Sequence, residues 1–362
     1  MNILHLANHC DEVGNGIMNV AVDLACGQAD LGHRVAFASG GGSFVRLLEA
    51  HGVEHSHVEQ PWRQPFRLFA AYRKIRQIIH HFQPDIISAH MVTGALLGHA
   101  LRTSGGFCLV TTVHNEWQRT AKLMGVGDRV IAVSDNVRDR MESRGVPSQK
   151  LRVVRNGPLG SPRRALREGA DETVILQRPA VVTVAGMYER KGIRELIEAF
   201  VMTSAEYPDA WLYLVGEGPD RPKFQTLAES QFCKDRIVFT GFQKDPRPYL
   251  EQADVFVLAS RSDPSPLVIP EAREAGCAII ATAAGGIPEA LNGGEAGILV
   301  PPLRIDLLAD ALRLLLADPG ERAAWRARAR MNLQELNIAR TVAETIRVYE
   351  DCLAPDRVSK PR

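Results

Sequence analysis

The sequence predicts an α/β fold built from two doubly wound, Rossmann-like domains. Short apolar runs typical of strands alternate with amphipathic segments along the chain, and a proline- and glycine-rich stretch interrupts this alternation near the middle. With 362 residues, the chain is too long for one ordinary core and suits two domains. We therefore expect two parallel sheets, each covered by helices on both faces and facing the other across a cleft.

The first half of the chain predicts an N-terminal domain over residues 1–160. Its strands are expected at Ile3–Ala7, Arg34–Ser39, Asp85–Ala89, Cys108–His114, Arg129–Ser134 and Leu151–Val154. Its helices are expected at Ile17–Leu31, Phe66–Phe82, Gly94–Thr103 and Asn136–Ser143.

A linker is expected over residues 161–179, where prolines and glycines occur without a clear period. The C-terminal domain is expected over residues 180–335, and a final helix within residues 336–362. The strands of this domain are predicted at Val181–Ala185, Trp211–Val215, Ile237–Thr240, Val255–Ala259, Ala278–Ala281 and Ile298–Val300. Its clearest helices are predicted at Arg194–Phe200, Glu271–Gly276 and Leu307–Leu316.

Composition argues against several classes of function. A formal net charge of +1, with no basic block or recognition motif, gives no support to nucleic-acid binding. The six cysteines are scattered and contain no Cys-x-x-Cys pair, which suits a reducing cytoplasm. We expect no secretion signal and no membrane span, because no apolar run approaches ~20 residues.

Two acidic residues, Asp263 and Glu271, follow the predicted strand Val255–Ala259. Asp263 is expected in a loop at the carboxyl end of that strand, and Glu271 near the start of the next helix. Ligands of open α/β sheets bind at this edge, where helix amides also attract anions. Two carboxylates beside an anion site suit a nucleotide-sugar, which has hydroxyls at both ends and phosphates between them.

Lys191 opens the helix that follows the strand Val181–Ala185, and Arg190 precedes it. The positive end of the helix dipole disfavours a cation there, so an anion bound by both the lysine and the helix amides would explain it. The alternative is an exposed lysine in solvent. Near the next strand edge, Gly285 and Gly286 are expected to cradle a ligand, with Glu289 in a structural role.

Gly14 and Gly16 lie between the first strand and the first helix. A dinucleotide fingerprint would have a third glycine where Asn19 stands and an acid at the end of the second strand, so a nicotinamide cofactor is not expected. The glycines permit close approach of a phosphate or sugar, or they form a plain turn. His114, and more weakly His90, ends a strand where a neutral imidazole can contact a sugar or pack beneath a loop.

Common catalytic and metal motifs are absent from the chain. It has no Asp-x-Asp, no phosphate-binding Gly-x-x-x-x-Gly-Lys-Ser/Thr loop, no His-Glu-x-x-His and no Gly-x-Ser-x-Gly. We therefore expect no metal and no cofactor. The charge of a leaving diphosphate would be met by Lys191, an arginine and helix amides.

Over nearly its whole length the chain resembles the retaining glycosyltransferases of family 4, which have the two-domain GT-B architecture. The resemblance depends on the order and spacing of Gly14-Asn-Gly16, His114, Val130-Ile-Ala-Val-Ser134, Val154-Arg-Asn156-Gly157, Lys191-Gly192, Leu214-Val-Gly216-Glu-Gly218-Pro219, Phe239-Thr-Gly241, Asp263 with Glu271-Ala272, and Gly285-Gly286-Ile-Pro-Glu289.

The resemblance implies a role for each candidate residue. In such enzymes the C-terminal domain binds a nucleotide-sugar, the N-terminal domain lies on the acceptor side, and the last helix crosses back to it. Catalytic roles fall to Asp263 at the transferred sugar, Lys191 at the diphosphate and His114 at the sugar. Donor-binding roles fall to Glu271 at the ribose and to Gly14, Gly16, Arg190, Leu267, Val268 and Gly286.

Three positions depart from the family pattern. Asp263 stands where a glutamate is usual, and Pro266 where a glycine is common. Gly186 replaces the family's diphosphate-binding arginine, for which Arg190 or Arg261 are candidate substitutes.

The expected reaction is metal-independent transfer of a hexosyl group to a hydroxyl acceptor with retention of configuration. The acceptor is expected to be a glycan or lipid-linked glycan of envelope polysaccharide or lipopolysaccharide. The basic amphipathic segment 62–82 is expected either to rest on the inner face of the cytoplasmic membrane or to pack on its sheet with a solvated basic face. The alternatives are a nucleotide-sugar epimerase of the same fold and a non-catalytic nucleotide- or carbohydrate-binding homologue.

Overall fold

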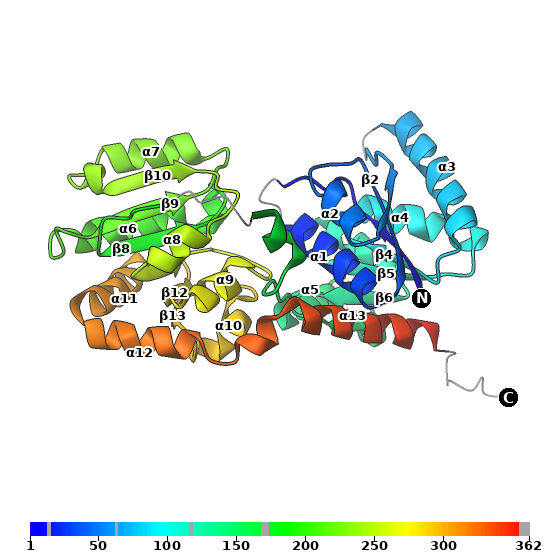
Figure 1. The fold of residues 1–362 in the computed structure, drawn as a ribbon. Coiled ribbons are helices and arrows are strands. Elements are labelled where there is room, and N and C mark those ends of the chain that lie inside the picture. Colours follow the sequence, from blue (N-terminus) through cyan, green and yellow to red (C-terminus); the bar gives the residue numbers. More distant parts are fainter. Residues whose placement is uncertain (13–15, 62–63, 116–118, 168–173, 355–362) are drawn as a thin grey trace. The chain divides into compact units, whose positions relative to one another are not determined.

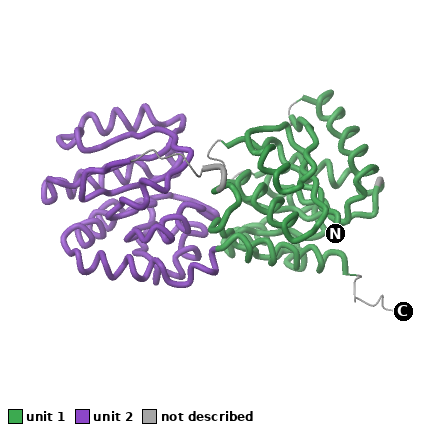
Figure 2. The backbone as a smooth tube through the Cα atoms, viewed as in Figure 1, with its two compact units in different colours: residues 1–166, 337–362 green, residues 167–336 purple. Residues whose placement is uncertain are grey.

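The computed structural model describes residues 1–12, 16–61, 64–115, 119–167 and 174–354. The chain divides into two compact units (Figure 2). Unit 1 comprises Met1–Leu166 and Asn337–Arg362, and unit 2 comprises Arg167–Leu336. The polypeptide therefore leaves unit 1, completes unit 2 and returns to unit 1 with its last helix.

Among the described residues of unit 1, seven parallel strands form a sheet in the order β3-β2-β1-β4-β5-β6-β7. The strands are β1 (Asn2–Leu6), β2 (Arg34–Ser39), β3 (Glu54–His57), β4 (Ile86–Ala89), β5 (Cys108–Val113), β6 (Arg129–Ala132) and β7 (Leu151–Val153). The helices are α1 (Gly16–Asp30), α2 (Val45–Ala50), α3 (Pro65–Phe82), α4 (Val92–Ala100), α5 (Asp135–Ser143) and α13 (Ile338–Leu353) (Figure 1). Buried residues lie on both faces of the sheet, since Ile3 and Leu4 belong to different apolar clusters.

The sequence did not predict β3, which pairs with β2 at the edge of the sheet. Its four residues, Glu-His-Ser-His, contain no apolar side chain, and none of them is fully buried. An edge strand that packs little of its surface into the core leaves no apolar pattern to detect.

In the described part of unit 2, six parallel strands follow the order β10-β9-β8-β11-β12-β13. The strands are β8 (Ala180–Val184), β9 (Trp211–Val215), β10 (Ile237–Gly241), β11 (Val255–Leu258), β12 (Ala278–Thr282) and β13 (Ile298–Val300). The helices are α6 (Ile193–Thr203), α7 (Arg221–Glu229), α8 (Arg247–Gln252), α9 (Val268–Ala275), α10 (Ile287–Ala290), α11 (Ile305–Ala317) and α12 (Pro319–Ala329). Both sheets confirm the predicted doubly wound α/β class, with reversals of strand order between β1 and β4 and between β8 and β11.

The last helix and the segment before unit 2 are both anchored in unit 1. On α13, Val342 packs so closely on α1 that a Cβ added at Gly27 would lie 2.7 Å from it. In the segment that precedes unit 2, the buried Arg163 donates two hydrogen bonds to the buried Asp23 of α1, at 2.8 and 2.9 Å.

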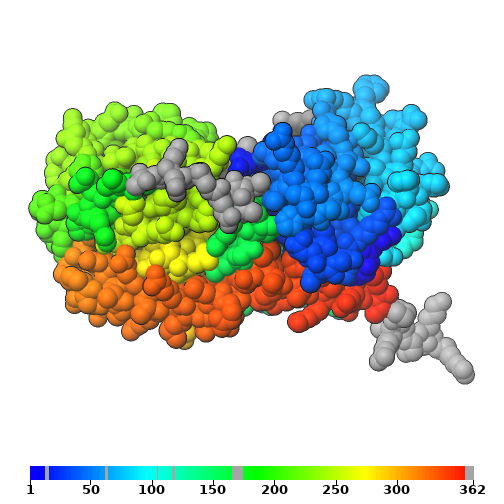
Figure 3. Space-filling model, viewed as in Figure 1, coloured from blue at the N-terminus to red at the C-terminus, as the bar shows by residue number. Residues whose placement is uncertain are grey.

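Helix α3 lies at the surface of unit 1, where it forms the light-blue part of the space-filling view (Figure 3). Its buried residues are Ala71, Ile75, Ile79 and Phe82, while most of its other side chains face solvent. In the described part of the chain, no helix combines the length and apolar character that crossing a membrane requires.

Candidate functional site

The two predicted ligand-binding segments of unit 2 follow neighbouring strands at the reversal of strand order. Lys191 ends a short 3-10 turn (Glu189–Lys191) after β8, and Asp263 lies in the loop after β11. The two strands pair directly, with Val181 opposite Val255. Ligands of open parallel sheets bind outside the carboxyl ends of the strands at such a reversal. The fold therefore brings both residues to one candidate site.

Lys191 and Asp263 form a largely buried ion pair. The Nζ atom of Lys191 donates to Oδ2 of Asp263 at 2.5 Å, and the side chains are 17% and 7% exposed. Either charge alone would be strongly disfavoured in this environment, whereas the pair is neutral overall. The sequence predicted a separate ligand contact for each residue and did not predict this direct contact.

Glycines hold the loops that carry this ion pair. Gly192 has a φ of 69°, and a Cβ there would lie 1.8 Å from the carbonyl oxygen of Ala259. Gly285 has a φ of 60°, and a Cβ there would lie 2.1 Å from the carbonyl oxygen of Asp263, which also accepts from the amide of Gly286 at 2.8 Å. Only glycine allows both the left-handed backbone and these close approaches. The amide of Gly286 thus has a partner within the protein, and its contact with a donor stays a prediction.

A second set of charged side chains holds the same loops in place. Nε of Arg261 donates to Glu195 on α6 at 2.6 Å, and its Nη2 donates to Glu189 at 3.3 Å. The hydrogen bond with Glu195 is the main cause that raises the pKa of Arg261. This guanidinium, a candidate substitute for the missing arginine, is therefore held by acidic side chains of the unit. Sequence reasoning missed Glu195; its only signal is a charged side chain on the apolar side of a helix.

Arg190, the other candidate substitute, lies over an aromatic ring. A Cβ at Gly186 would lie 2.9 Å from the ring of Tyr188, so this ring covers the position where the family's arginine is missing. The guanidinium of Arg190 lies 5.2 Å from the centre of the same ring, within the range of a cation–π contact. The turn thus provides a second cation immediately before Lys191.

The start of α9 presents the remaining predicted donor contacts of unit 2. The helix begins at Val268 after Leu267, and the half-buried Glu271 lies in its first turn. First-turn amides have no acceptor within their own helix and can bind an anion. The helix starts three residues before Glu271, where its start was predicted. The contacts of Leu267, Val268 and Glu271 with a donor stay predictions.

In unit 1, Gly16 is an exposed residue that opens α1, while Gly14 lies outside the described residues. His114 follows β5 and is half-buried, and its Nε2 lies 3.2 Å from Nδ1 of His90. Burial lowers the pKa of His114 to about 4, so the ring is neutral near pH 7. The roles of Gly16 and His114 in ligand binding stay predictions.

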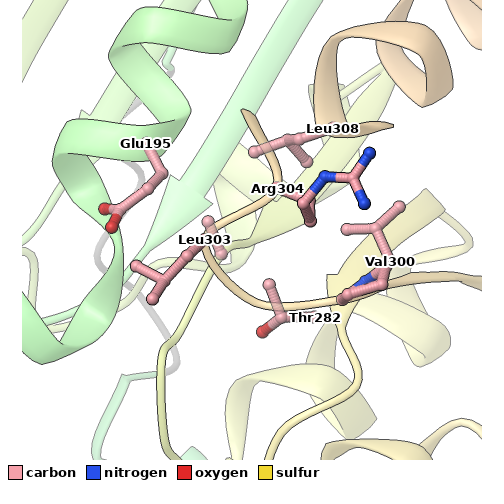
Figure 4. A pocket seen from close by; sticks show the side chains of 8 residues that line it. Glu195, Thr282, Val300, Leu303, Arg304 and Leu308 are labelled. Atoms are coloured by element: carbon pink, nitrogen blue, oxygen red, sulfur yellow. The ribbon is translucent and has the colours of Figure 1, made fainter. Parts of the chain in front are cut away.

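A small hollow lies beside the carboxyl edge of the unit 2 sheet (Figure 4). It is lined by Glu195, Ala259, Thr282, Val300, Pro301, Leu303, Arg304 and Leu308. Its volume of ≈ 10 Å³ has room for about one water molecule. The hollow is too small for a nucleotide-sugar.

One group of potential metal ligands occurs among the described residues, formed by Cys108, Asp128 and Cys352. Asp128 already accepts from Arg102 at 2.6 Å and from the amide of Leu109 at 2.8 Å. Because Cys108 begins β5, the group lies at the edge of the sheet opposite the carboxyl ends of the strands. It is separate from the candidate site, and a metal-independent reaction stays a prediction.

Comparison with known proteins gives matches in both units. A model of "Glycosyl transferases group 1" matches residues 170–332, and a model of "Glycosyltransferase Family 4" matches residues 14–157. The α-maltose-1-phosphate synthase of Mycolicibacterium smegmatis is 30% identical over 290 residues, which are 74% of this chain and 72% of that protein. The chain belongs to the group 1 glycosyltransferases of family 4.

Other relatives of this glycosyltransferase agree with the assignment. The lipopolysaccharide core biosynthesis glycosyltransferase LpsE of Rhizobium meliloti is 29% identical over 307 residues, 78% of this chain and 87% of that protein. Among solved structures, the Anabaena Alr3699/HepE complex with UDP and glucose has a TM-score of 0.81 at 20% identity and covers 97% of this chain and 100% of that one. A glycosyltransferase from Rickettsia africae has the same TM-score and identity, with coverage of 97% and 98%. These likenesses confirm the predicted GT-B fold.

Proposed function

We propose that this glycosyltransferase moves a sugar from a nucleoside-diphosphate sugar to an acceptor hydroxyl, with retention of configuration and without a metal ion. The observation that carries the proposal is the buried Lys191–Asp263 pair at the strand reversal of unit 2. A lysine ammonium there is a suitable partner for a diphosphate, and Asp263 holds it in position when no donor is bound. Supporting this donor class, Anabaena HepE has been solved with UDP-glucose, and a Mycolicibacterium smegmatis relative is named as GDP-mannose-dependent.

In the proposed reaction, the bond between the sugar's anomeric carbon and the diphosphate oxygen breaks as the acceptor oxygen bonds to that carbon on the same face. A diphosphate oxygen takes the proton of the acceptor hydroxyl. The protein positions the reactants and stabilises the leaving charge through Lys191, Arg190 and the first-turn amides of α9. Asp263 would accept a hydrogen bond from the transferred sugar once the diphosphate attracts the ammonium, and Glu271 would accept from the ribose.

We further propose that the acceptor is glycan-like and lipid-linked, and that α3 contacts an anionic membrane. Phe66 and Phe69 are 90% and 62% exposed, and Arg73 and Arg76 continue the same exposed stripe at helical spacing. Among the described residues, neither arginine forms an ion pair, so both charges are available to anionic headgroups. One relative, LpsE of Rhizobium meliloti, is named for lipopolysaccharide core biosynthesis, which supports an envelope acceptor.

A donor screen tests the proposal. Purified protein would be incubated with UDP-, GDP- and ADP-sugars in the presence of EDTA, with deacylated lipopolysaccharide core and simple glycosides as acceptors. Transfer from one donor class, with the α-anomeric product expected from an α-linked donor, would support retention without metal. Inversion, or activity restored only by a divalent ion, would contradict the mechanism, and interconversion of the donor without an acceptor would indicate an epimerase.

Flotation with anionic and neutral liposomes tests the membrane contact separately. Wild-type protein should float with anionic vesicles at low salt. A Phe66→Ser, Phe69→Ser double variant should lose most of this binding, whereas a change at the exposed Phe232 of unit 2 should not affect it. Equal flotation of the wild type and the double variant would rule out α3 as the contact.

A further inference from the structure

Three imidazole rings form a hydrogen-bonded row across the sheet of unit 1. His5 lies on β1, and His90 and His114 directly follow β4 and β5, the next two strands of the sheet. Nδ1 of His5 lies 2.9 Å from Nε2 of His90, and Nδ1 of His90 lies 3.2 Å from Nε2 of His114. The planes of the first two rings are nearly parallel, at 7° to each other. The row runs from the interior towards the carboxyl edge of the sheet.

Gln28 fixes the inner end of this row. Nε2 of His5 lies 2.8 Å from Oε1 of Gln28 on α1, and both residues are fully buried. In this orientation of the Gln28 amide, Oε1 faces His5 and can only accept, so Nε2 of His5 carries the hydrogen. The tautomer of the innermost imidazole is therefore set by one side chain of α1.

The tautomer of each ring determines the tautomer of the next ring. A neutral imidazole has one N–H and one lone pair, so Nδ1 of His5 accepts and Nε2 of His90 donates. By the same step, Nδ1 of His90 accepts from Nε2 of His114. Burial lowers the pKa of His5 and His114 to about 4 and that of His90 well below its usual value, which keeps all three rings neutral.

Nδ1 of His114 remains at the outer end of the row with its lone pair. It forms no hydrogen bond within the described residues, and His114 is half-buried just beyond the end of β5. The amide oxygen at the inner end cannot pass a proton on, so the row orients its members and does not form a proton path.

We propose that Gln28, His5 and His90 are positioning residues that fix the tautomer of His114, so that its Nδ1 accepts a hydrogen bond from a sugar hydroxyl. The tautomers follow from the ring contacts together with the orientation of the Gln28 amide, while the sugar as ligand rests on the proposed function. The sequence predicted only a contact between this imidazole and a sugar, whereas the row specifies that Nδ1 of His114 accepts.

Nitrogen-15 NMR of histidine side chains tests the tautomers on the intact, ligand-free protein. We expect hydrogen on Nε2 of all three rings in the wild type. Gln28→Met, which keeps the side-chain length but removes the acceptor, should give His114 a mixture of tautomers. Gln28→Glu retains an acceptor and should preserve hydrogen on Nε2. Hydrogen on Nδ1 of His114 in the wild type, or an unchanged tautomer in Gln28→Met, would overturn the proposal. The wild-type spectrum shows whether Nε2 carries the hydrogen in each of the three rings, even if a variant fails to fold.

Kinetics tests the ligand separately. With a donor that supports transfer, Gln28→Met is expected to lower kcat/KM by 3- to 10-fold. One deoxy-sugar donor should lower the kcat/KM of the wild type by the same factor. That deoxy-sugar donor should cause no further loss of kcat/KM in Gln28→Met. If no deoxy donor behaves in this way, the sugar contact is wrong. Failure of every sugar-transfer assay would refute the proposed function while leaving the NMR result unchanged.

Discussion

Lys191 and Asp263 lie 72 residues apart in the chain, yet their side chains meet at 2.5 Å in unit 2. The contact exists because their loops follow β8 and β11, which pair at the reversal of strand order. Arg261 and two glycines fix the same loops from either side. Under the proposed function, Asp263 holds the ammonium of Lys191 until a phosphate oxygen of the donor replaces it.

Lys191→Ala should reduce sugar transfer by roughly 10²–10³-fold, as expected when one preorganised stabilising group is removed from the leaving charge. Lys191→Arg should recover part of the activity because it restores the charge in a different geometry. Lys234→Ala, at an exposed position of unit 2, provides the control and should leave turnover unchanged. Initial rates with saturating donor would measure the effect, and a fully active Lys191→Ala would remove the diphosphate assignment.

Asp263→Asn should separate binding from turnover. The amide no longer competes as an anion for the ammonium, so a nucleoside diphosphate should bind at least as tightly as it does to the wild type. Transfer should fall by at least tenfold, because the acceptor for the sugar hydroxyl is altered. Binding by calorimetry and initial rates would be compared in the same buffer. Weaker diphosphate binding, or unchanged turnover, would contradict this account of the pair.

Gly192→Ala should destabilise unit 2 far more than Gly293→Ala. Both glycines have a φ of 69°, but a Cβ at Gly293 would meet nothing within 4 Å, whereas one at Gly192 would meet the Ala259 carbonyl oxygen at 1.8 Å. The shared backbone strain is about 1–2 kcal/mol, and the clash should add about 1–3 kcal/mol. Urea unfolding would measure both, and equal effects would show that the loop adapts without strain.

Arg163→Met should lower the stability of unit 1 by roughly 3–5 kcal/mol, since it leaves the buried Asp23 carboxylate without its cation. Arg313→Met removes a cation from the exposed pair with Glu206 in unit 2 and should change stability by less than about 1 kcal/mol. Calorimetric unfolding of the two variants would compare these environments. A small effect at Arg163 would mean that water reaches Asp23.

Stability should fall as the pH decreases from about 6.5 to about 4. Burial lowers the pKa of His5 and His114 to about 4 in the folded protein, while the unfolded chain binds protons at the usual value. The unfolded state therefore binds more protons in this window, and stability increases with pH across it. Unfolding free energies at several pH values would test this, and His114→Asn should show a shallower slope. A flat profile would contradict the neutral row.

The sequence predicted the core of the fold well because most positions of the central strands are apolar. Val255–Leu258, for example, is buried at every position. The edge strand Glu54–His57 escaped detection because it packs few side chains into the core. The sequence motifs alone were sufficient to place Lys191, Asp263 and Glu271 at the ends of strands or helices.

Contacts between segments distant in the sequence were beyond sequence reasoning. Spacing cannot show that Asp263 pairs with Lys191, that Glu195 holds Arg261, or that Tyr188 covers Gly186. These contacts depend on side-chain directions set by the packing of loops. The histidine row was missed for the same reason, since His5 lies within a strand and gave no sign of a link to His114.

Calorimetric titration of uridine, guanosine and adenosine diphosphates into the wild type and Lys191→Ala, in the presence of EDTA, tests the diphosphate site most directly. We predict that one nucleotide binds the wild type without any divalent ion and binds Lys191→Ala at least tenfold more weakly. Binding that requires a divalent ion, or equal affinity for the two proteins, would contradict a diphosphate site built on Lys191.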